Sequence, residues 1–509
     1  MNDMNVELSK LDLWILAAYF LGILIFGMYI SRRVKGGADY FLAGRSLPFW
    51  AIGLSIVGSD IGAVDFVGLV GQAFRHGLVT ANMDWIGSLP ALILVAFVFV
   101  PYYWRAGVYS VPEYLGRRYD QRVRAVQTIA WTLFMICNLG VTFWATAQMF
   151  EGLLGWDKTF TIVLMGFFTG VYTVSGGLMA DVWTDVVQVV IMIGGASFVV
   201  VKGIWRLGGI GALHDQVLAR GGPDRWTLYH TVESGSPYSW PAILVGLTLV
   251  LAPAYFGANP AIVQRCLGAR NEWSAKAGVL FAALFKFLIP FIVVVPGLIG
   301  YALYPQLAEE HGDRIFSYLV RDLLPEGLRG IVVAAFVAGF MSNVDSMLNS
   351  SATLLTQDIY AGILGFPLDD KKALRIGRNI TLSLIIFGAL SAPLSKRFDG
   401  VYVAIQSLLA IIQGPTIALL FIGMFWRRAT ATAGFYAGVI GLATSILLTI
   451  LHKNLENGLF ATEEPFFWIA PLSCGVTAVL LVALSFLGPR KSDAELHGLV
   501  YSLREENAA

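Results

Sequence analysis

The sequence predicts an all-α polytopic membrane protein. Of its 509 residues, 57% are hydrophobic and only 14% are charged, whereas soluble domains carry about 25% charged residues. Apolar segments of about 20 residues, each long enough to cross a bilayer as a helix, recur along the whole chain. The N-terminal stretch lacks a basic region before its apolar run, which argues against a cleaved signal peptide.

We expect thirteen membrane-spanning helices joined by mostly short connections. The expected spans, with boundaries good to a few residues, cover residues 11–31, 47–72, 80–104, 125–150, 158–177, 182–205, 240–263, 276–304, 328–359, 377–398, 401–426, 431–452 and 465–488. Two longer connections, 206–239 and 307–330, are each predicted to carry short amphipathic helices.

Basic residues predict the orientation of the chain. They follow the first, third, seventh, ninth, eleventh and last spans, and with thirteen spans all these connections lie on one side. Cytoplasmic connections carry an excess of lysine and arginine. We therefore predict a multi-pass cell-membrane protein with its N-terminus outside and its C-terminus in the cytoplasm. The residues are Arg32, Arg33, Lys35, Arg45, Arg105, Arg117, Arg118, Arg122, Arg124, Arg265, Arg270, Lys276, Lys371, Lys372, Arg375, Arg378, Arg427, Arg428, Arg490 and Lys491.

Several other classes of protein are disfavoured by composition. A net charge of +1 gives no reason to expect nucleic acid as a partner. The three cysteines are scattered and suggest no disulfide framework, and no HExxH metal motif is present. The C-terminal tail of about twenty residues after the last span is too short for a soluble signalling domain.

Six ionisable side chains fall inside or near the expected spans. Each charge at a helix centre costs roughly 2.5–3.5 kcal/mol, and such groups normally face a bundle interior or a watery cavity. They are Asp60, Asp65, Asp84, Asp185, Lys286 and Asp345. A structural ion pair between Lys286 and one aspartate is the alternative to a functional role, but one lysine cannot neutralise five carboxylates.

Two segments have the composition of a cation site. In "VGSDIGAVDFVGLVG" (57–71) glycines alternate with Asp60 and Asp65. A helix break there would free backbone carbonyls, which coordinate sodium in many secondary transporters, although a small-residue packing face is the alternative. In "GFMSNVDSMLNSSATLLTQDIY" (339–360) Ser342, Asp345 and Ser346 share a helix face, and oxygen ligands suit hard cations.

Five segments resemble the solute:sodium symporter family. They are "DYFLAGRSLPFW" (39–50), "GSDIGAVDFVGLVG" (58–71), "SGGLMADVWTDVVQ" (175–188), "IVQRCLGAR" (262–270) and "NSSATLLTQDIY" (349–360). The resemblance is strongest to the sodium/glucose cotransporter branch and covers nearly the whole chain, with the motifs in order at matching spacing.

The resemblance implies the LeuT-type fold, in which two inverted repeats of five helices each begin with a broken helix. It also implies sodium-coupled uptake by alternating access, with sodium as the co-transported ion. The implied organisation is a leading helix and cytoplasmic loop (1–46), a first repeat (47–206), an outer loop (207–239), a second repeat (240–426), and two extra helices with a short tail (427–509).

The family's common sodium site implies five ligand positions here. The backbone carbonyls of Gly58 and Ile61 would face Gly339, Ser342 and Asn343. The family usually carries two adjacent hydroxyls where this chain has Ser342 and Asn343, and an asparagine amide can also supply an oxygen.

The substrate site implied by the resemblance has six members. Asp84 stands where glucose transporters have a glutamate, while Lys286 and Gln406 match that branch's lysine and glutamine. The segment "APAYFGANP" contributes Tyr255 as the aromatic inner gate and also Asn259. Asp65 replaces a glutamine or histidine. This set suits a sugar or polyol, and Asp65 also permits a cationic substrate.

A second sodium ion is a further expectation. Asp185 matches an aspartate that family members carry on the fifth core helix, and this chain adds Asp345 and Ser346 on the eighth. Two nearby buried carboxylates would repel each other, and a bound sodium would relieve that repulsion. The alternatives are one proton shared by the two aspartates, or two aspartates that never meet.

The sequence therefore predicts a sodium symporter for a small polar solute, most readily a sugar, that works in the lipid bilayer as a monomer. A sialic acid, an amino acid or a vitamin stays open as substrate. A membrane-embedded enzyme is disfavoured because no GxGD, HExxH or GxSxG motif accompanies the buried acids. A sensor built on the transporter fold is disfavoured by the short tail.

Overall fold

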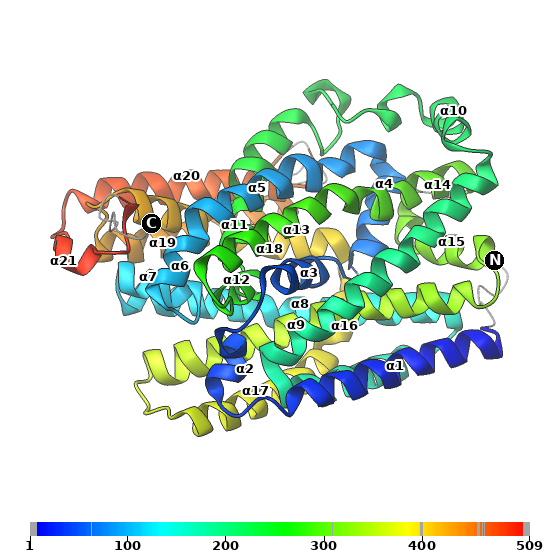
Figure 1. Ribbon diagram of the computed structural model, residues 1–509. Coiled ribbons are helices and arrows are strands. Elements are labelled where there is room, and N and C mark those ends of the chain that lie inside the picture. The colour runs from blue at the N-terminus through cyan, green and yellow to red at the C-terminus, as the bar shows by residue number, and fades with distance from the viewer. Residues whose placement is uncertain are drawn as a thin grey trace.

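The protein is helical, as its sequence predicts. The computed structural model describes residues 8–62, 64–307, 309–397, 401–455, 459–460, 462 and 464–501. Within these ranges the β pairing consists of two isolated bridges, Leu47 with Ala269 and His230 with Ser239. Figure 1 shows the long helices packed side by side along a common direction.

The long helices are α1 (Lys10–Ser31), α3 (Phe49–Asp60), α8 (Gln121–Leu154), α9 (Lys158–Leu207), α13 (Glu272–Val293), α16 (Leu328–Thr353), α17 (Asp370–Ser391), α18 (Val401–Phe425), α19 (Ala431–Asn454) and α20 (Phe466–Ser485). The shorter α-helices are α2 (Gly37–Leu42), α4 (Val70–His76), α5 (Leu89–Leu94), α6 (Val100–Ala106), α7 (Val111–Arg118), α10 (Ile210–Gly221), α11 (Ala252–Ala258), α12 (Pro260–Leu267), α14 (Val295–Leu303), α15 (Ile315–Leu323) and α21 (Asp493–Leu496).

Segments of π-helix extend several spans: η2 (Asp65–Leu69), η4 (Met83–Ser88), η5 (Val95–Phe99), η8 (Ala242–Leu251) and η10 (Leu354–Ile363). The 3₁₀ turns are η1 (Ala43–Arg45), η3 (Gly77–Ala81), η6 (Pro223–Trp226), η7 (Val232–Ser234), η9 (Glu309–Arg314) and η11 (Ala392–Arg397). The two long connections carry α10 and α15, so the expectation of short helices there is confirmed.

The spans predicted from the sequence are present as helices. In the described ranges ten helices are long and apolar enough to cross a membrane, and two bent helix pairs raise that number to twelve. The thirteenth span comes from α9, because its 50 residues would measure about 75 Å if straight, more than twice the thickness of a bilayer's hydrocarbon core.

Helix α9 folds back on itself at Gly177. The ring of Phe168 lies 4.4 Å from that of Phe20, and the Gln188 amide donates to the Tyr19 hydroxyl at 3.4 Å. A straight helix would separate Phe168 from Gln188 by about 30 Å, yet both meet neighbouring residues of α1. The chain reverses because Gly177 has φ +50° and ψ −147°, a conformation that glycine tolerates.

Two spans are broken, and each break is at the start of an expected repeat. Helix α3 ends at Asp60, and the axis of the helical segment that begins at Asp65 is inclined by 57°. The second break separates the segment Ala242–Ala258 from α12, with a bend of 52°. These breaks agree with the broken first helices that the family resemblance implies.

The second break has a local cause. Pro260 begins α12, and proline disfavours a helical conformation in the residue before it. That residue, Asn259, has extended backbone, and its side chain accepts the Ala261 N–H at 3.0 Å. Asn259 therefore acts as the N-cap of α12. Its side chain satisfies a backbone N–H that the break leaves without a helical partner.

Helix α16 is the buried centre of the bundle. Nearly all its side chains are buried, and it packs against α9, α1, α8 and α17. Its N-terminus is held by Asp12 of α1, whose Oδ1 accepts the backbone N–H groups of Gly327 at 2.8 Å and Gly330 at 2.7 Å. A carboxylate at a helix N-terminus also complements the helix dipole.

One basic residue assigned to a connection is a structural anchor. Arg118 has no exposed surface and donates to the carbonyls of Gly423 (2.6 Å), Trp426 (2.9 Å) and Ala429 (3.1 Å). It satisfies the Gly423 carbonyl, which has no helical partner in the last turn of α18, and two carbonyls in the connection that follows this helix.

We expect Gly177→Ala to destabilise the protein strongly. A Cβ at this position would lie 2.4 Å from the Tyr40 carbonyl oxygen, and a positive φ adds about 1–2 kcal/mol for an L-residue. Gly194→Ala is the matched control, because a Cβ there meets nothing within 4 Å and alanine is the better helix former. The measurement is the melting temperature in detergent, where equal values for the two variants would contradict the fold-back.

Candidate functional site

A central cavity of about 120 Å³ lies beside both helix breaks. Its lining comes from the broken spans and from η4, α8, α13, α16 and α18. The lining residues are Asp60, Val64, Asp65, Leu69, Met83, Asp84, Ser88, Asn138, Leu247, Leu251, Ala252, Tyr255, Phe256, Lys286, Asn343, Tyr402, Ile405, Gln406, Leu409 and Gln413. The cavity thus combines an apolar wall with a small number of charged and polar groups.

The structure brings five of the six predicted substrate residues to this cavity. They are Asp65, Asp84, Tyr255, Lys286 and Gln406. Asn259 is not among the lining residues, since its side chain is committed to the N-cap of α12. Of the six predicted residues, Asn259 is the one that does not line the cavity.

Lys286 forms a buried ion-pair triad. Its ammonium lies 2.6 Å from Asp84 Oδ1 and also contacts Asp60 Oδ2, and the three side chains are 5–8% exposed. The Ser88 hydroxyl adds a 3.3 Å hydrogen bond to Asp84. The ion pair of Lys286 with an aspartate that the sequence suggests is present, and it involves two aspartates, Asp84 and Asp60. Because removing one partner of a buried pair leaves an uncompensated charge, the triad fixes α3, η4 and α13 together.

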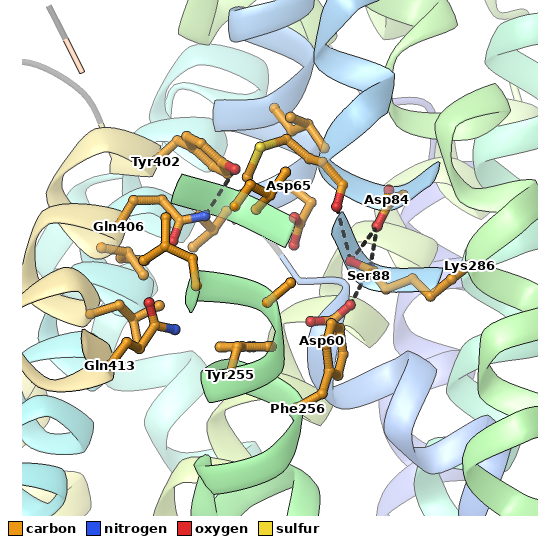
Figure 2. A pocket seen from close by; sticks show the side chains of 18 of the residues that line it. Asp60, Asp65, Asp84, Ser88, Tyr255, Phe256, Lys286, Tyr402, Gln406 and Gln413 are labelled. Atoms are coloured by element: carbon orange, nitrogen blue, oxygen red, sulfur yellow. Dashed lines mark hydrogen bonds and ion pairs between the residues drawn. The ribbon is translucent and has the colours of Figure 1, made fainter. Parts of the chain in front are cut away.

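The opposite wall of the cavity is built from amides and aromatic residues. Gln406 of α18 donates to the Tyr402 hydroxyl at 2.9 Å, as Figure 2 shows. Gln413, two turns further along α18, and Asn138 of α8 each have a buried side-chain oxygen with no hydrogen-bond partner. Buried acceptors without donors are costly, so these oxygens are suited to bind donors from a solute.

The sequence prediction missed Asn138 and Gln413. Gln413 follows Gln406 by seven residues, which places it on the same helix face. Asn138 is a single amide inside an otherwise apolar run. A search for isolated amides on the inner faces of spans would have found both residues.

The five predicted sodium-site residues gather where α3 ends against α16. A Cβ on Gly58 would lie 2.8 Å from the Ser342 hydroxyl, and a Cβ on Gly339 would lie 3.4 Å from the Ile61 carbonyl oxygen. The two helices approach this closely because both crossing positions are glycine. The last carbonyls of α3 are also the negative end of its dipole.

Asn343 adds an oxygen to the same crossing. Its Nδ2 donates to the Ser59 carbonyl at 2.9 Å, which fixes the orientation of the amide because a carbonyl needs a donor. The Oδ1 that remains is buried and has no hydrogen-bond partner. The crossing therefore offers backbone carbonyls, a hydroxyl and a free amide oxygen, a donor set suited to a hard cation.

The buried guanidinium of Arg265 is connected to this crossing through Asp185, which also accepts a hydrogen bond from Ser342. Arg265, expected in a cytoplasmic connection, is instead part of α12 and has no exposed surface. Its Nη2 donates to Asp181 at 3.0 Å and to Asp185 at 3.1 Å. The same nitrogen reaches the Ser346 hydroxyl at 2.6 Å, and its Nε reaches Ser55 at 2.6 Å. The sequence prediction missed this position because the expected apolar span ends at residue 263, whereas α12 continues to Leu267.

The residues proposed for a second sodium have protein partners. Asp185 accepts hydrogen bonds from Ser55 and Ser342 besides its ion pair with Arg265. Asp345 points to a different pair of donors, the hydroxyls of Tyr172 and Thr173 in the first half of α9. The two carboxylates therefore bind separate partners, and Ser346 belongs to the Arg265 cluster.

A family model described as "Sodium:solute symporter family" matches residues 40–441. The chain belongs to the sodium:solute symporter family. A sodium/glucose cotransporter of Vibrio parahaemolyticus is 30% identical over 477 residues, covering 89% of this chain and 87% of the relative. A human sodium/myo-inositol cotransporter is 29% identical and covers 96% of this chain and 74% of its own length.

Solved structures show the same fold. A sodium-coupled sialic acid symporter, in a substrate-bound outward-open state, superposes with a TM-score of 0.83 at 23% identity, covering 95% of this chain and 99% of the other. Mhp1, a nucleobase-cation-symport-1 family transporter in a closed conformation, gives a TM-score of 0.59 at 15% identity, covering 90% and 97%. The chain has the LeuT-type fold implied by its sequence.

The comparisons also establish the class of activity. This symporter is a multi-pass membrane protein that couples sodium to the transport of a polar solute. It is a transporter and not an enzyme, as its family and its structural neighbours are transporters.

We expect Arg265→Met to lower the stability of the folded protein by several kcal/mol. The substitution leaves Asp181 and Asp185 buried without a cation, and breaking a buried pair costs about 3–5 kcal/mol. Arg105→Met is the matched control, because its pair with Glu272 is partly exposed and such pairs contribute only about 0.2–1 kcal/mol. Melting curves in detergent provide the comparison, and equal losses would show that Arg265 is not a structural cation.

Proposed function

We propose that this symporter imports a sugar or related hydroxylated solute, bound in the central cavity beside the break in α3. The supporting observation is the polar lining, which offers carboxylates, an ammonium and unsatisfied amide oxygens on an apolar wall. Each of these groups can bind solute hydroxyls. Tyr255 and Phe256 supply aromatic surface in the same cavity.

The proposed sodium site is the crossing of α3 and α16. Its ligands are the carbonyls of Gly58 and Ile61 together with Ser342 and Asn343, while Gly339 allows the close approach. Coupling follows from the order of residues along the break. Ile61 would bind the ion, and its neighbour Asp60 belongs to the cavity, so ordering the break by sodium also orders the substrate site. By linkage, substrate then raises the affinity for sodium.

We propose one sodium ion per substrate. The second site expected from the sequence would use Asp185, Asp345 and Ser346, but the Arg265 guanidinium already supplies positive charge to Asp185 and contacts Ser346. Asp345 is engaged by two hydroxyls elsewhere. Because the oxygen ligands expected for a second ion already have protein donors, these contacts support one ion per substrate.

The remaining features of the proposal concern the whole chain. The basic connections support an external N-terminus and a cytoplasmic C-terminus in the cell membrane. The two bent spans support repeats that begin near residues 47 and 240. Because the cavity is lined by one chain, a monomer would suffice for alternating access.

A sialic acid, an amino acid or a vitamin is the second candidate solute, since one structural neighbour binds a sialic acid.

We expect Ser342→Ala to weaken sodium binding and leave the protein folded. Loss of one hydroxyl ligand worth about 1.4 kcal/mol would raise the sodium concentration for half-maximal transport about tenfold. Ser351→Ala is the control, because it removes a buried hydroxyl from the same helix more than two turns away. Unchanged sodium dependence in a well-folded Ser342→Ala protein would reject the assignment of this ligand.

Purified protein in liposomes should accumulate a sugar when sodium is higher outside and the interior is negative. For one sodium ion, a tenfold change in the sodium gradient should shift the reversal potential as far as a tenfold change in the substrate gradient. Two ions would double the ratio of these shifts. The assay uses a panel of radiolabelled sugars with potassium in place of sodium as the control. The proposal fails if no sugar enters in a sodium-dependent way.

A further inference from the structure

The charged groups of the cavity do not balance. Three carboxylates line it, and one ammonium does. Asp60 and Asp84 both hold Lys286. Asp65 lies on the helical segment after the break, and no cationic side chain in the described part of the chain pairs with it.

The position of Asp65 is fixed while part of its carboxylate stays available. Its Oδ2 accepts the Gly62 N–H at 2.8 Å, which is the back-bond that an acidic residue forms near a helix start. The side chain lines the cavity and is only half-buried. Its other oxygen is not among the enclosed polar atoms that lack a hydrogen-bond partner. Asp65 therefore presents carboxylate surface to whatever occupies the cavity.

Lys286 does not neutralise the whole cavity. Its one positive charge is already shared by two carboxylates from different helices, and Asp65 is the third carboxylate of the lining. A neutral polyol would therefore leave excess negative charge in a cavity with many apolar lining residues, where an unpaired charge is costly. A cation brought in by the substrate would remove this excess.

We propose that the substrate carries a protonated amino group that binds Asp65, in addition to hydroxyl groups that bind the amides. The chemical class is an amino sugar or an aminocyclitol. An ammonium supplies three donors and one positive charge, and Asn138 and Gln413 offer unsatisfied oxygens to the hydroxyls. This inference rests on the proposed function, since it assumes that the cavity is the substrate site.

The test compares matched sugars in proteoliposomes that contain the full chain. Each hexose of a panel (glucose, galactose and mannose) is assayed with its 2-amino-2-deoxy form and its N-acetyl form, at a pH where the free amine is charged. N-acetylation keeps the nitrogen but removes the charge. We expect at least one amino sugar to be transported with a half-saturation concentration about tenfold lower than either neutral partner.

Asp65→Asn should abolish this preference. An asparagine oxygen can still accept the Gly62 N–H, so the local fold is kept while the charge is lost. Asp157→Asn is the control, since it also replaces a helix-capping aspartate, but this aspartate is exposed and is not among the cavity-lining residues. It should retain the wild-type preference.

The reversal potential gives an independent measure of substrate charge. With one sodium ion, a tenfold change in a cationic substrate should shift the potential half as far as the same change in a neutral one. The ratio of sodium and substrate shifts is unaffected, so ion count and substrate charge are separable.

Two outcomes would overturn the inference alone. They are sodium-driven transport in which neutral sugars are preferred or equal, and an amino-sugar preference that persists in Asp65→Asn. Absence of sodium-driven uptake for every sugar would instead refute the proposed function, and the inference with it.

Discussion

The interruption of one helix organises this transporter. Where α3 stops at Asp60, its last carbonyls lose their helical partners, and membrane depth allows such a break only where protein or water covers it. Helix α16 covers one side through glycine contacts, and the cavity occupies the other. An ion and a solute can thus meet the same few residues from opposite sides. The glycines, the buried acids and the close packing of α16 all follow from keeping this break.

A second principle is that buried basic side chains neutralise carboxylates inside the membrane-spanning bundle. Lys286 neutralises charge in the cavity, and Arg265 does so between α3, α9, α12 and α16. The two cations differ in whether a solute can reach their partners. Arg265 has five donors and is fully enclosed by protein acceptors, which suits a permanent tie. Lys286 faces a cavity, so its partners can be shared with a solute.

Much of the fold follows from simple patterns, and the exceptions have a common cause. Apolar runs located every span, and glycines beside Asp60 and Asp65 marked the first break. The sequence places Arg265 in a connection because hydropathy registers where an apolar run ends, whereas burial depends on which helices surround the residue. Asn259 was assigned to the substrate by motif, but the following proline makes it a helix cap. The sequence could not show that the side-chain oxygens of Asn138 and Gln413 lack hydrogen-bond partners, because this depends on which residues surround them in the fold.

The cap that Asp12 places on α16 gives the first helix a role beyond anchoring. Ser9 and Asp12 form a capping box at the start of α1, and the same carboxylate ties down two amides at the start of the central helix. The leading span is thereby a structural part of the core rather than an appended segment. Anyone who engineers this protein for expression has little freedom here: tags and fusions belong before Ser9. A chain trimmed to the two repeats would expose the end of the helix that carries part of the proposed sodium site.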